Sequence, residues 1–324
     1  MVGPFDAVLL VAFGGPQGPA DVRPFLENVL RGRRVSPARV EEVAHHYDLF
    51  GGVSPLTELT MQQARALQAT LAARGLPLPV HVGMRNWHPY LADTLTEMSR
   101  RGVRRVVGVL AAAQRSYSGC TQYKENVRDA LKTVVERGAR PIEVVYVGDW
   151  HENPGFIAAN AENVRRAIAQ LPEARRAGAR LVFTAHSIPI EMAQQFPYEA
   201  QLRASAALIA AAAGRQDWDL VYQSRSGRPG DLWLEPDVCD YLRAEREKGL
   251  DTVVLCPVGF LCDHVEVLYD LDVEAAEACR EARIAMVRAQ AVNAHPRFID
   301  ALADAVAETN ERFKKGTPLA ITRP

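Results

Sequence analysis

The sequence lacks the features that mark membrane, secreted and nucleic-acid-binding proteins. No apolar run approaches the roughly 18 residues that a membrane-spanning helix needs. No basic residues precede the apolar run in the opening MVGPFDAVLLVAF, as they would in a secretion signal. Lys and Arg number 38 against 39 Asp and Glu, so no general positive field attracts nucleic acid. We therefore expect a soluble, cytoplasmic protein without nucleic-acid partners and without integral membrane association.

Cysteine is also scarce, with 5 residues in 324. These cysteines form no C-x-x-C pair and show no recognised zinc-binding spacing. Without an export signal we expect them to be reduced thiols. Cys256 and Cys279 lie in apolar segments and are expected to be small core residues, whereas Cys120, in QRSYSGCTQY, is expected in a loop.

Short apolar runs rich in β-branched residues recur along the chain, with helical patterns between them. Continuous apolar runs are typical of strands covered by helices on both faces, and their alternation with helices predicts parallel sheets. The predicted strands are 6–13, 78–84, 104–112, 142–148, 179–186, 219–224, 251–260 and 282–289. We therefore expect an α/β protein with two similar Rossmann-like domains, each with a four-stranded parallel sheet flanked by helices.

The strand pattern also predicts the domain boundaries. An N-terminal Rossmann-like domain is expected over 1–150, a connecting helical segment over 151–178, a C-terminal Rossmann-like domain over 179–313 and a loose tail over 314–324. In such sheets, ligands bind beyond the carboxyl ends of the strands. The motifs that directly follow strands are therefore the candidates for a functional site.

A glycine-rich segment, FGGPQGP (13–19), follows the first predicted strand. It does not match G-x-G-x-x-G, and it lacks the Lys of a phosphate-binding loop. A tight turn, where the backbone approaches another segment or a flat ligand, is therefore favoured over nucleotide binding.

His186, in TAHSIP, stands at the end of a predicted strand. A histidine there can accept a proton or bind a metal, because its unperturbed pKa lies close to physiological pH. It can equally be a core histidine bonded to the backbone. The residue alone leaves both interpretations open.

An acidic segment, CDHVEVLYDLDVEA (262–275), follows the strand predicted at 251–260. Asp263 and Glu266 have the spacing of a helix capping box, which would explain two of the acids without any chemistry. Glu266, Asp270 and Glu274 follow at i, i+4 and i+8 and would form one stripe on a helix, where like charges repel. A cation or a chain of protons would offset that repulsion, and a stripe that faces solvent is the alternative.

Aromatic and basic residues follow strands in the first half. Trp87, in MRNWHPY, is expected either to hold a flat apolar ligand or to close the core. Arg31, in RGRR (31–34), is expected either to end a surface helix, where cations are favoured, or to bind carboxylates on the rim of a site.

Taken in order, these motifs resemble the ferrochelatase family, whose members insert ferrous iron into a porphyrin to make haem. The family has two Rossmann-like domains, in agreement with the strand pattern. The resemblance implies that His186 takes a pyrrole proton or binds the metal, that Glu266 faces it, and that Asp270 and Glu274 form a path for metal or protons. The matching stretches are LLVAFGGP, FGGVSPL, RNWHPY, SYSGCTQY, FTAHSIP, VYQSRSG, LWLEPD, CPVGFLCDHVEVLYDLD and NAHPRFIDAL.

The resemblance also implies substrate contacts in the first half of the chain. Ser54 and Tyr123 match positions that hold a porphyrin propionate, Arg31 is expected at the rim, and Phe13 and Trp87 are expected against the ring. Phe13 stands where some members have a Tyr close to the iron, so no phenolate ligand is expected there.

Iron is expected as a substrate, Fe(II), with no prosthetic group. Some members of the family carry a [2Fe–2S] cluster on four cysteines, three of them near the C-terminus. Cys120 resembles the first of these, but no cysteine follows Cys279. Because such a cluster needs four thiolates, we expect none here.

We therefore expect a monomeric ferrochelatase of haem biosynthesis, a lyase whose partners are a porphyrin and ferrous iron. Coproporphyrin III is favoured over protoporphyrin IX, because no apolar membrane-binding extension is evident and the RGRR segment suits extra propionates. Two alternatives stay open: a chelatase of the same architecture that loads cobalt or nickel, and a non-catalytic haem or tetrapyrrole carrier. A carrier would need the aromatic residues but neither a base at His186 nor an acid at Glu266.

Overall fold

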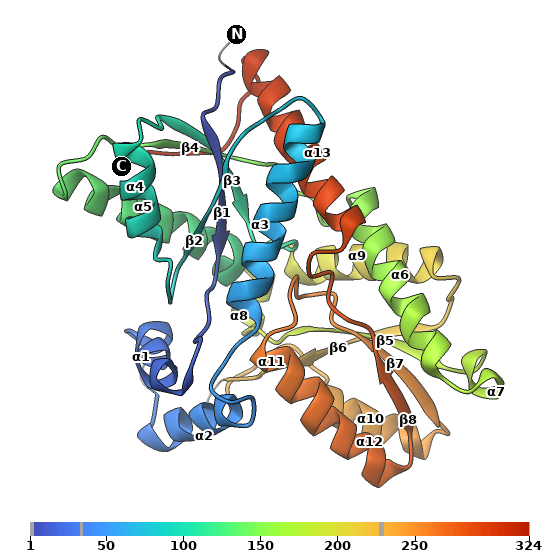
Figure 1. The fold of residues 1–324 in the computed structure, drawn as a ribbon. Coiled ribbons are helices and arrows are strands. Elements are labelled where there is room, and N and C mark those ends of the chain that lie inside the picture. The colour runs from blue at the N-terminus through green and yellow to red at the C-terminus, as the bar shows by residue number, and fades with distance from the viewer. Residues whose placement is uncertain (1–2, 33–34, 227–229, 324) are drawn as a thin grey trace. The chain divides into compact units, whose positions relative to one another are not determined.

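The computed structural model describes residues 3–32, 35–226 and 230–323. The chain folds into two compact units. The first unit comprises Met1–Ala111, Ser118–Asp149 and Ile299–Pro324, and the second comprises Ala112–Tyr117 and Trp150–Phe298. Each unit has its own sheet with helices packed on it (Figure 1), which confirms the predicted α/β class with two domains.

The sheet of the first unit has the strand order β2-β1-β3-β4-β9. Its first four strands run parallel, with β1 between β2 and β3, and only β9 runs antiparallel, against β4. Every residue of β1 is buried, as its unbroken apolar sequence predicts. The strands are β1 (Ala7–Ala12), β2 (Val80–Met84), β3 (Arg105–Leu110), β4 (Glu143–Tyr146) and β9 (Ile321–Thr322).

Helices α4 and α5 cover one face of this sheet. Leu9 and Val11 of β1 pack there with Leu95 of α4 and with Val127 and Leu131 of α5. The helices of the first unit are α1 (Pro19–Leu30), α2 (Pro37–Asp48), α3 (Leu56–Ala73), α4 (Leu91–Arg100), the π-helix η1 (Tyr117–Thr121), α5 (Gln122–Glu136) and most of α13 (Pro296–Lys314).

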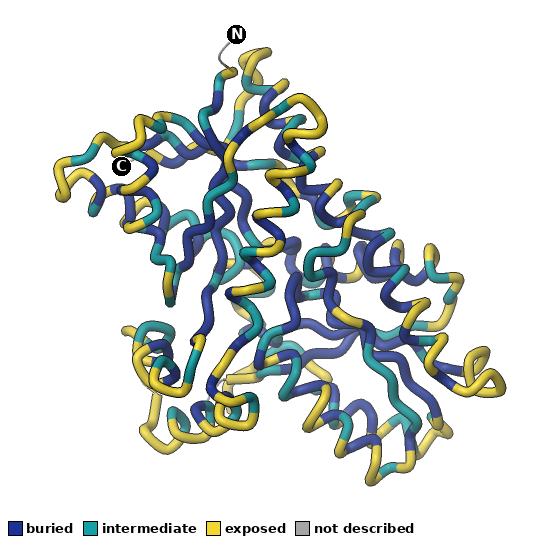
Figure 2. The backbone as a smooth tube through the Cα atoms, in the orientation of Figure 1, coloured by how far each residue is buried: buried dark blue, intermediate teal, exposed yellow. Residues whose placement is uncertain are grey.

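The sheet of the second unit is wholly parallel, in the order β6-β5-β7-β8. Its strands are β5 (Arg180–His186), β6 (Trp218–Gln223), β7 (Thr252–Cys256) and β8 (Ala285–Arg288). Figure 2 shows the central strands buried, with exposed residues on the outer sides of the helices. The helices are α6 (Pro154–Gln170), α7 (Glu173–Arg176), α8 (Ile190–Gln195), α9 (Tyr198–Ala212), α10 (Val238–Glu247), α11 (Val265–Val267), the π-helix η2 (Leu268–Ala275) and α12 (Ala276–Ala282).

The C-terminal domain begins and ends at other residues than the sequence predicts. The segment predicted as a connector, 151–178, lies within the second unit and carries α6 and α7, and the chain after Phe298 belongs to the first unit. The tail predicted to be loose instead carries β9. Tyr146 is held there through a backbone N–H donated to Ala320 O (2.9 Å) and a hydroxyl bonded to Thr322 Oγ1 (3.1 Å). A two-residue strand has too little periodicity to be visible in a sequence.

None of the helices in the described part of the chain is long and apolar enough to cross a bilayer.

Candidate active site

His186 is the last residue of β5, and its ring is fixed by the next residue. Nδ1 lies 2.5 Å from the carbonyl oxygen of Ser187. Because a carbonyl can only accept, Nδ1 carries the proton and donates it to this bond. In the neutral ring, Nε2 therefore holds the free lone pair, which can take a proton or bind a metal ion.

The backbone on both sides of His186 is also held in place. The buried hydroxyl of Tyr198, on α9, donates to His186 O at 3.0 Å. Burial raises the pKa of Tyr198 well above its usual value, which keeps this donor protonated. On the other side, Ser187 N donates to Gln223 O of the neighbouring strand β6 at 2.8 Å. A histidine held this firmly is presented at a defined position, as acid–base catalysis requires.

The loop after β7 packs directly on the end of β5. Gly259 N donates to Thr184 O at 3.1 Å. A Cβ added to Gly259 would lie 2.6 Å from Ala185 Cβ, closer than real Cβ atoms approach, so only glycine fits this position. This close approach brings the acidic segment that follows the loop near His186.

Glu266, on α11, faces His186. Its Oε2 lies 4.0 Å from Nε2 of the imidazole, and both side chains are partly exposed. This separation is too long for a direct hydrogen bond. A metal ion bound by both atoms, with bonds of about 2.0–2.2 Å each, would span a similar distance. The pair can therefore receive a cation or pass a proton, and the rest of the cation's coordination sphere stays open to other ligands.

Asp270, in η2, continues the line of acids from Glu266. Its side chain is buried and accepts hydrogen bonds from Ser224 Oγ and from Gln223 Nε2, the latter at 3.2 Å. Burial is the main cause that raises the pKa of Asp270 to about 7, and the nearby charges of Glu266 and Glu274 raise it further. Near neutral pH this carboxyl group is therefore able both to hold and to release a proton.

The acidic stripe begins on the short α-helix α11 and continues on the π-helix η2, where the sequence predicts one α-helix. Val267, Leu271 and Ala275 pack into the core on the sheet. Glu266, Asp270 and Glu274 each precede one of these residues, so they follow one flank of the helix. π-Helical turns are rare and occur often at functional sites.

The capping-box interpretation of Asp263 is wrong. The residue that caps α11 is His264, whose Nδ1 accepts a hydrogen bond from Glu266 N at 3.2 Å. Asp263 instead accepts bonds from Arg288, Ala291 and Asn293. The acids of this segment are therefore not explained by helix capping.

In the first unit, three of the predicted substrate-binding residues lie close together. The Arg85 guanidinium stacks 4.4 Å from the ring centre of Tyr123 and 5.6 Å from that of Phe13. Phe25 packs edge-on against both Phe13 and Trp87, at 6.2 and 6.3 Å between ring centres. The carboxyl ends of β1 and β2 therefore carry an aromatic cluster with one cation.

Ser54 lies beneath the glycine-rich turn. Its backbone N–H donates to Pro16 O at 2.8 Å, and a Cβ on Gly15 would lie 2.7 Å from Ser54 Cβ. The backbone of FGGPQGP thus approaches the FGGVSPL segment closely, as the tight-turn interpretation predicts. Ser54 is buried in this contact.

Arg31 follows the last residue of α1 and is exposed. Its Nη2 donates to Asn28 Oδ1 at 2.6 Å, and Asn28 in turn donates to Asn86 O and Tyr90 Oη. This chain of bonds links Arg31 to the loop that carries Trp87. The other arginines of RGRR, at 33 and 34, lie outside the described residues.

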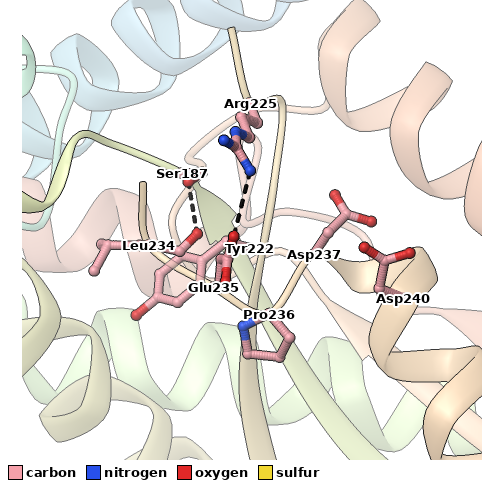
Figure 3. A pocket seen from close by; sticks show the side chains of 8 residues that line it. All are labelled: Ser187, Tyr222, Arg225, Leu234, Glu235, Pro236, Asp237 and Asp240. Atoms are coloured by element: carbon pink, nitrogen blue, oxygen red, sulfur yellow. Dashed lines mark hydrogen bonds and ion pairs between the residues drawn. The ribbon is translucent and has the colours of Figure 1, made fainter. Parts of the chain in front are cut away.

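A polar pocket of about 210 Å³ borders His186 through Ser187. Figure 3 shows the Ser187 hydroxyl bonded to the carbonyl of Leu234 at 2.8 Å, and Arg225 paired with Glu235 at 3.3 Å. The other residues that line the pocket are Tyr222, Pro236, Asp237 and Asp240.

Two of the cysteines lie in the core as expected, whereas Cys120, expected in a loop, lies in a helical turn. Cys256 and Cys279 are buried, and burial raises the pKa of each thiol to about 12. Cys120 is half-buried within η1. The core interpretation of Cys256 and Cys279 is confirmed.

Sequence reasoning missed several residues of these two clusters. Gln223 ends β6, the strand beside β5, and Ser224 follows it directly; a polar residue at a strand's carboxyl end is a usable signal. Arg85 lies in the same motif as Trp87, and a cation among aromatic residues is a second usable signal. Tyr198 gave no signal, because its contact with His186 depends on how α9 packs.

Together, the fold and the site define an α/β protein in which a histidine and a row of carboxylates follow the strands of a wholly parallel sheet, a set of groups able to bind metal ions and exchange protons. Comparisons with known proteins agree with this class. A sequence model of the ferrochelatase family matches residues 5–310. A ferrochelatase of Rhodopirellula baltica is 51% identical over 94% of this chain and 86% of its own length. A coproporphyrin III ferrochelatase of Mycolicibacterium vanbaalenii is 46% identical over 94% and 89%.

The chain belongs to the ferrochelatase family, and it is a metal chelatase of the lyase class. The resemblance drawn from its motifs is thereby confirmed. Among solved structures, SirB from Bacillus subtilis with Fe³⁺ has a TM-score of 0.58 and covers 97% of this chain and 99% of its own. At 12% identity, that likeness shows the shared fold alone.

Proposed function

We propose that this protein is a ferrochelatase that inserts Fe(II) into a porphyrin in haem biosynthesis, with coproporphyrin III as the favoured substrate. The observation that carries the proposal is the free Nε2 of His186 facing the Glu266 carboxylate at 4.0 Å. The choice of porphyrin is supported by relatives named coproporphyrin III ferrochelatase, which are 44–47% identical to this chain.

The reaction replaces two pyrrole N–H protons of the macrocycle by one Fe²⁺, so two protons must leave the ring. His186 is suited to accept the first, because Nε2 is unprotonated in the neutral ring and Nδ1–H is held by Ser187 O. The bond to Ser187 also stabilises the imidazolium that forms, because a cationic donor strengthens a hydrogen bond.

Glu266 and Asp270 supply the path for ions on the same side. The Glu266 carboxylate can pair with the imidazolium or with incoming Fe²⁺, a divalent cation for which oxygen and imidazole are good ligands. Asp270 takes over a proton near neutral pH, because its pKa is raised to about 7. Glu274, exposed further along the same flank, is the outer end of this path.

In the first unit we assign recognition of the porphyrin to the residues around Arg85. Phe13 and Trp87 offer aromatic surface to the ring. Tyr123 and Ser54 are assigned to propionate binding, and the exposed Arg31 to a contact at the rim.

The proposed enzyme acts as a cytoplasmic monomer and requires no [2Fe–2S] cluster. Such a cluster needs four cysteine thiolates in one place. Cys239, Cys256, Cys262 and Cys279 belong to the second unit and Cys120 to the first, and among the described residues no three His, Cys, Asp or Glu side chains lie close enough together to hold a metal ion. Iron and sulfide recovered after anaerobic purification would overturn this part of the proposal.

The test is an anaerobic metallation assay with Fe(II), in which coproporphyrin III and protoporphyrin IX are offered separately. Loss of free-porphyrin fluorescence and growth of the metalloporphyrin Soret band are followed over time. Catalytic turnover with coproporphyrin III is the expected result, and faster turnover with protoporphyrin IX would reassign the substrate. Tight binding of both porphyrins without turnover would point to a carrier and overturn the proposal.

A further inference from the structure

The ionisable residues between 263 and 274 fall on two different sides of the segment that follows β7. Glu266 faces His186 of β5, and Asp270 accepts bonds from Gln223 and Ser224 at the end of β6. Asp263 and Asp272 instead meet Arg288, the last residue of β8. Glu266 and Asp270 therefore contact residues at the ends of β5 and β6, whereas Asp263 and Asp272 contact the end of β8.

Arg288 joins those last two acids through a single guanidinium group. Its Nε and Nη2 bind the two oxygens of Asp272 at 2.6 and 2.8 Å, and its Nη1 binds Asp263 Oδ1 at 2.8 Å. The side chain is only 12% exposed. Such a bidentate pair fixes the orientation of the carboxylate as well as its distance from the arginine, because the planar guanidinium matches the two carboxylate oxygens.

Asp263 is held from further directions. Its oxygens also accept from Ala291 N at 3.2 Å and from Asn293 Nδ2 at 2.8 Å, and its own N–H donates to Asn293 Oδ1 at 2.9 Å. Asn293 adopts a left-handed backbone conformation (φ 44°) to make these contacts. The start of the acidic segment is therefore fixed to the chain that follows β8, three residues before Glu266.

The strand order explains why this anchor matters. The sheet runs β6-β5-β7-β8, so β5 and β6 lie on one side of β7 and β8 lies on the other. After the loop that follows β7, α11, η2 and α12 continue one another as a single rod (Figure 1). Even a small rotation of this rod about its axis would move Glu266 away from His186, and the apolar contacts alone define the angle loosely because the hydrophobic effect is not directional. The bonds of Arg288 oppose that rotation.

We propose that Arg288 is a positioning residue for metal insertion. By joining Asp263 and Asp272 on the β8 side, it sets the orientation of η2, so that Glu266 and Asp270 are presented toward His186 and Ser224. Arg288 and Asp272 act through Glu266 and Asp270 and touch no substrate. This inference rests on the proposed function, since it names how that function's metal-facing groups are held.

The test compares D272N with E277Q. D272N removes the charge from the more exposed partner of Arg288 and leaves the bond to Asp263, so the fold is kept. E277Q is the matched control: it breaks an exposed carboxylate–arginine pair, with Arg280, on the adjoining helix α12. Steady-state kinetics are measured with Fe(II) or Zn(II) as the varied metal and coproporphyrin III in excess, together with porphyrin affinity by fluorescence quenching.

We expect D272N to raise the metal KM or lower kcat by about tenfold or more, as loss of a partner that orients a metal-binding group does. Porphyrin affinity should stay unchanged, and E277Q should match the wild type in every value. R288K, which keeps the charge but not the fork, should be impaired at least as much as D272N. If D272N lowers only the unfolding temperature, and its metal kinetics match E277Q in the folded range, the proposal is overturned.

A second readout separates this inference from the proposed function. Zn(II) affinity is measured by calorimetry without porphyrin for the wild type, D272N and E277Q. If the wild type binds zinc but turns nothing over, the proposed function fails. Weaker zinc binding by D272N alone would then still support the positioning role, and equal binding by all three proteins would overturn it.

Discussion

The carboxyl ends of the two sheets carry different kinds of side chains. After β1 and β2 of the first unit lie Phe13, Trp87 and a stacked Arg85. In the second unit, His186 ends β5, and Glu266 lies on α11 in the segment that follows β7. Because ligands bind at the carboxyl ends of parallel strands, both sets of residues are candidates for binding. One scaffold can therefore offer a surface for a flat ring in one unit and groups that titrate and bind cations in the other.

This comparison divides the proposed function between the two units. Changes in the second unit should affect metal kinetics and proton transfer, and changes in the first should affect porphyrin affinity. A variant in one unit that alters the property assigned to the other would break the comparison.

H186A should have the largest effect. Removal of the base is expected to lower turnover by roughly 10²–10⁴-fold, the usual range for loss of a general acid–base group. Porphyrin affinity, measured by fluorescence quenching, should stay within about twofold of the wild type, because the aromatic cluster is unchanged.

The control for H186A is H45A, which removes an exposed histidine from α2. It should leave both turnover and porphyrin affinity unchanged. Retention of most of the activity by H186A would contradict the base role and favour a carrier.

D270N tests the buried carboxyl group through stability. The folded-state pKa of Asp270 is raised from 3.8 to about 7, so between these values the folded protein holds a proton that the unfolded chain has lost. The unfolded state then binds fewer protons, and the free energy of unfolding falls as pH rises from about 4 to about 7. The fall due to this residue is no more than about 4 kcal/mol, and D270N should remove it.

Urea unfolding of the wild type and D270N at pH 4 and pH 8 measures this difference. D240N, which alters an exposed aspartate on α10, is the control and should keep the wild-type pH dependence. Parallel pH profiles for the wild type and D270N would show that Asp270 ionises as readily in the folded protein as in the unfolded chain.

Y123F tests the first unit. The substitution keeps the ring that packs in the core and stacks on Arg85, and it removes only the hydroxyl assigned to a propionate. Loss of a hydrogen bond to a charged group costs about 1.5 kcal/mol or more, which corresponds to a porphyrin Kd raised by about tenfold. At saturating porphyrin, kcat should change by less than about twofold.

Y146F is the matched control for Y123F. It removes a hydroxyl in the same unit, one bonded to Thr322 at 3.1 Å, and should leave porphyrin affinity unchanged. An unchanged Kd in Y123F would remove Tyr123 from the binding surface.

The strands, and the residues at their carboxyl ends, could be predicted from the sequence. The side-chain contacts between different elements could not. Buried parallel strands are continuous apolar runs, so both sheets and the place of His186 could be predicted. That Ser224 would meet Asp270, or Arg288 the opposite flank, depends on the strand order β6-β5-β7-β8, which local patterns do not encode.

The helix type could not be predicted either. The spacing of Glu266, Asp270 and Glu274 fits one flank of an α-helix as well as of the observed π-helix, so periodicity does not separate the two. The capping-box alternative was wrong for the same reason, because a local spacing does not reveal a contact with the distant Arg288. Local signals thus predicted which residues form the site, and long-range packing decided how they are oriented.

R31Q should have the smallest effect and tests the edge of the first unit. Arg31 is exposed, so its charge acts on a porphyrin propionate through solvent, where one such contact contributes about 0.2–1 kcal/mol. We expect the porphyrin KM to rise about two- to threefold at low ionic strength and to return to the wild-type value near 0.5 M salt, where screening is short-ranged. R65Q removes the same charge from an exposed site on α3 and should show no change at either salt concentration. If the two variants behave alike, Arg31 contributes only to net charge, and recognition by the first unit rests on the cluster around Arg85.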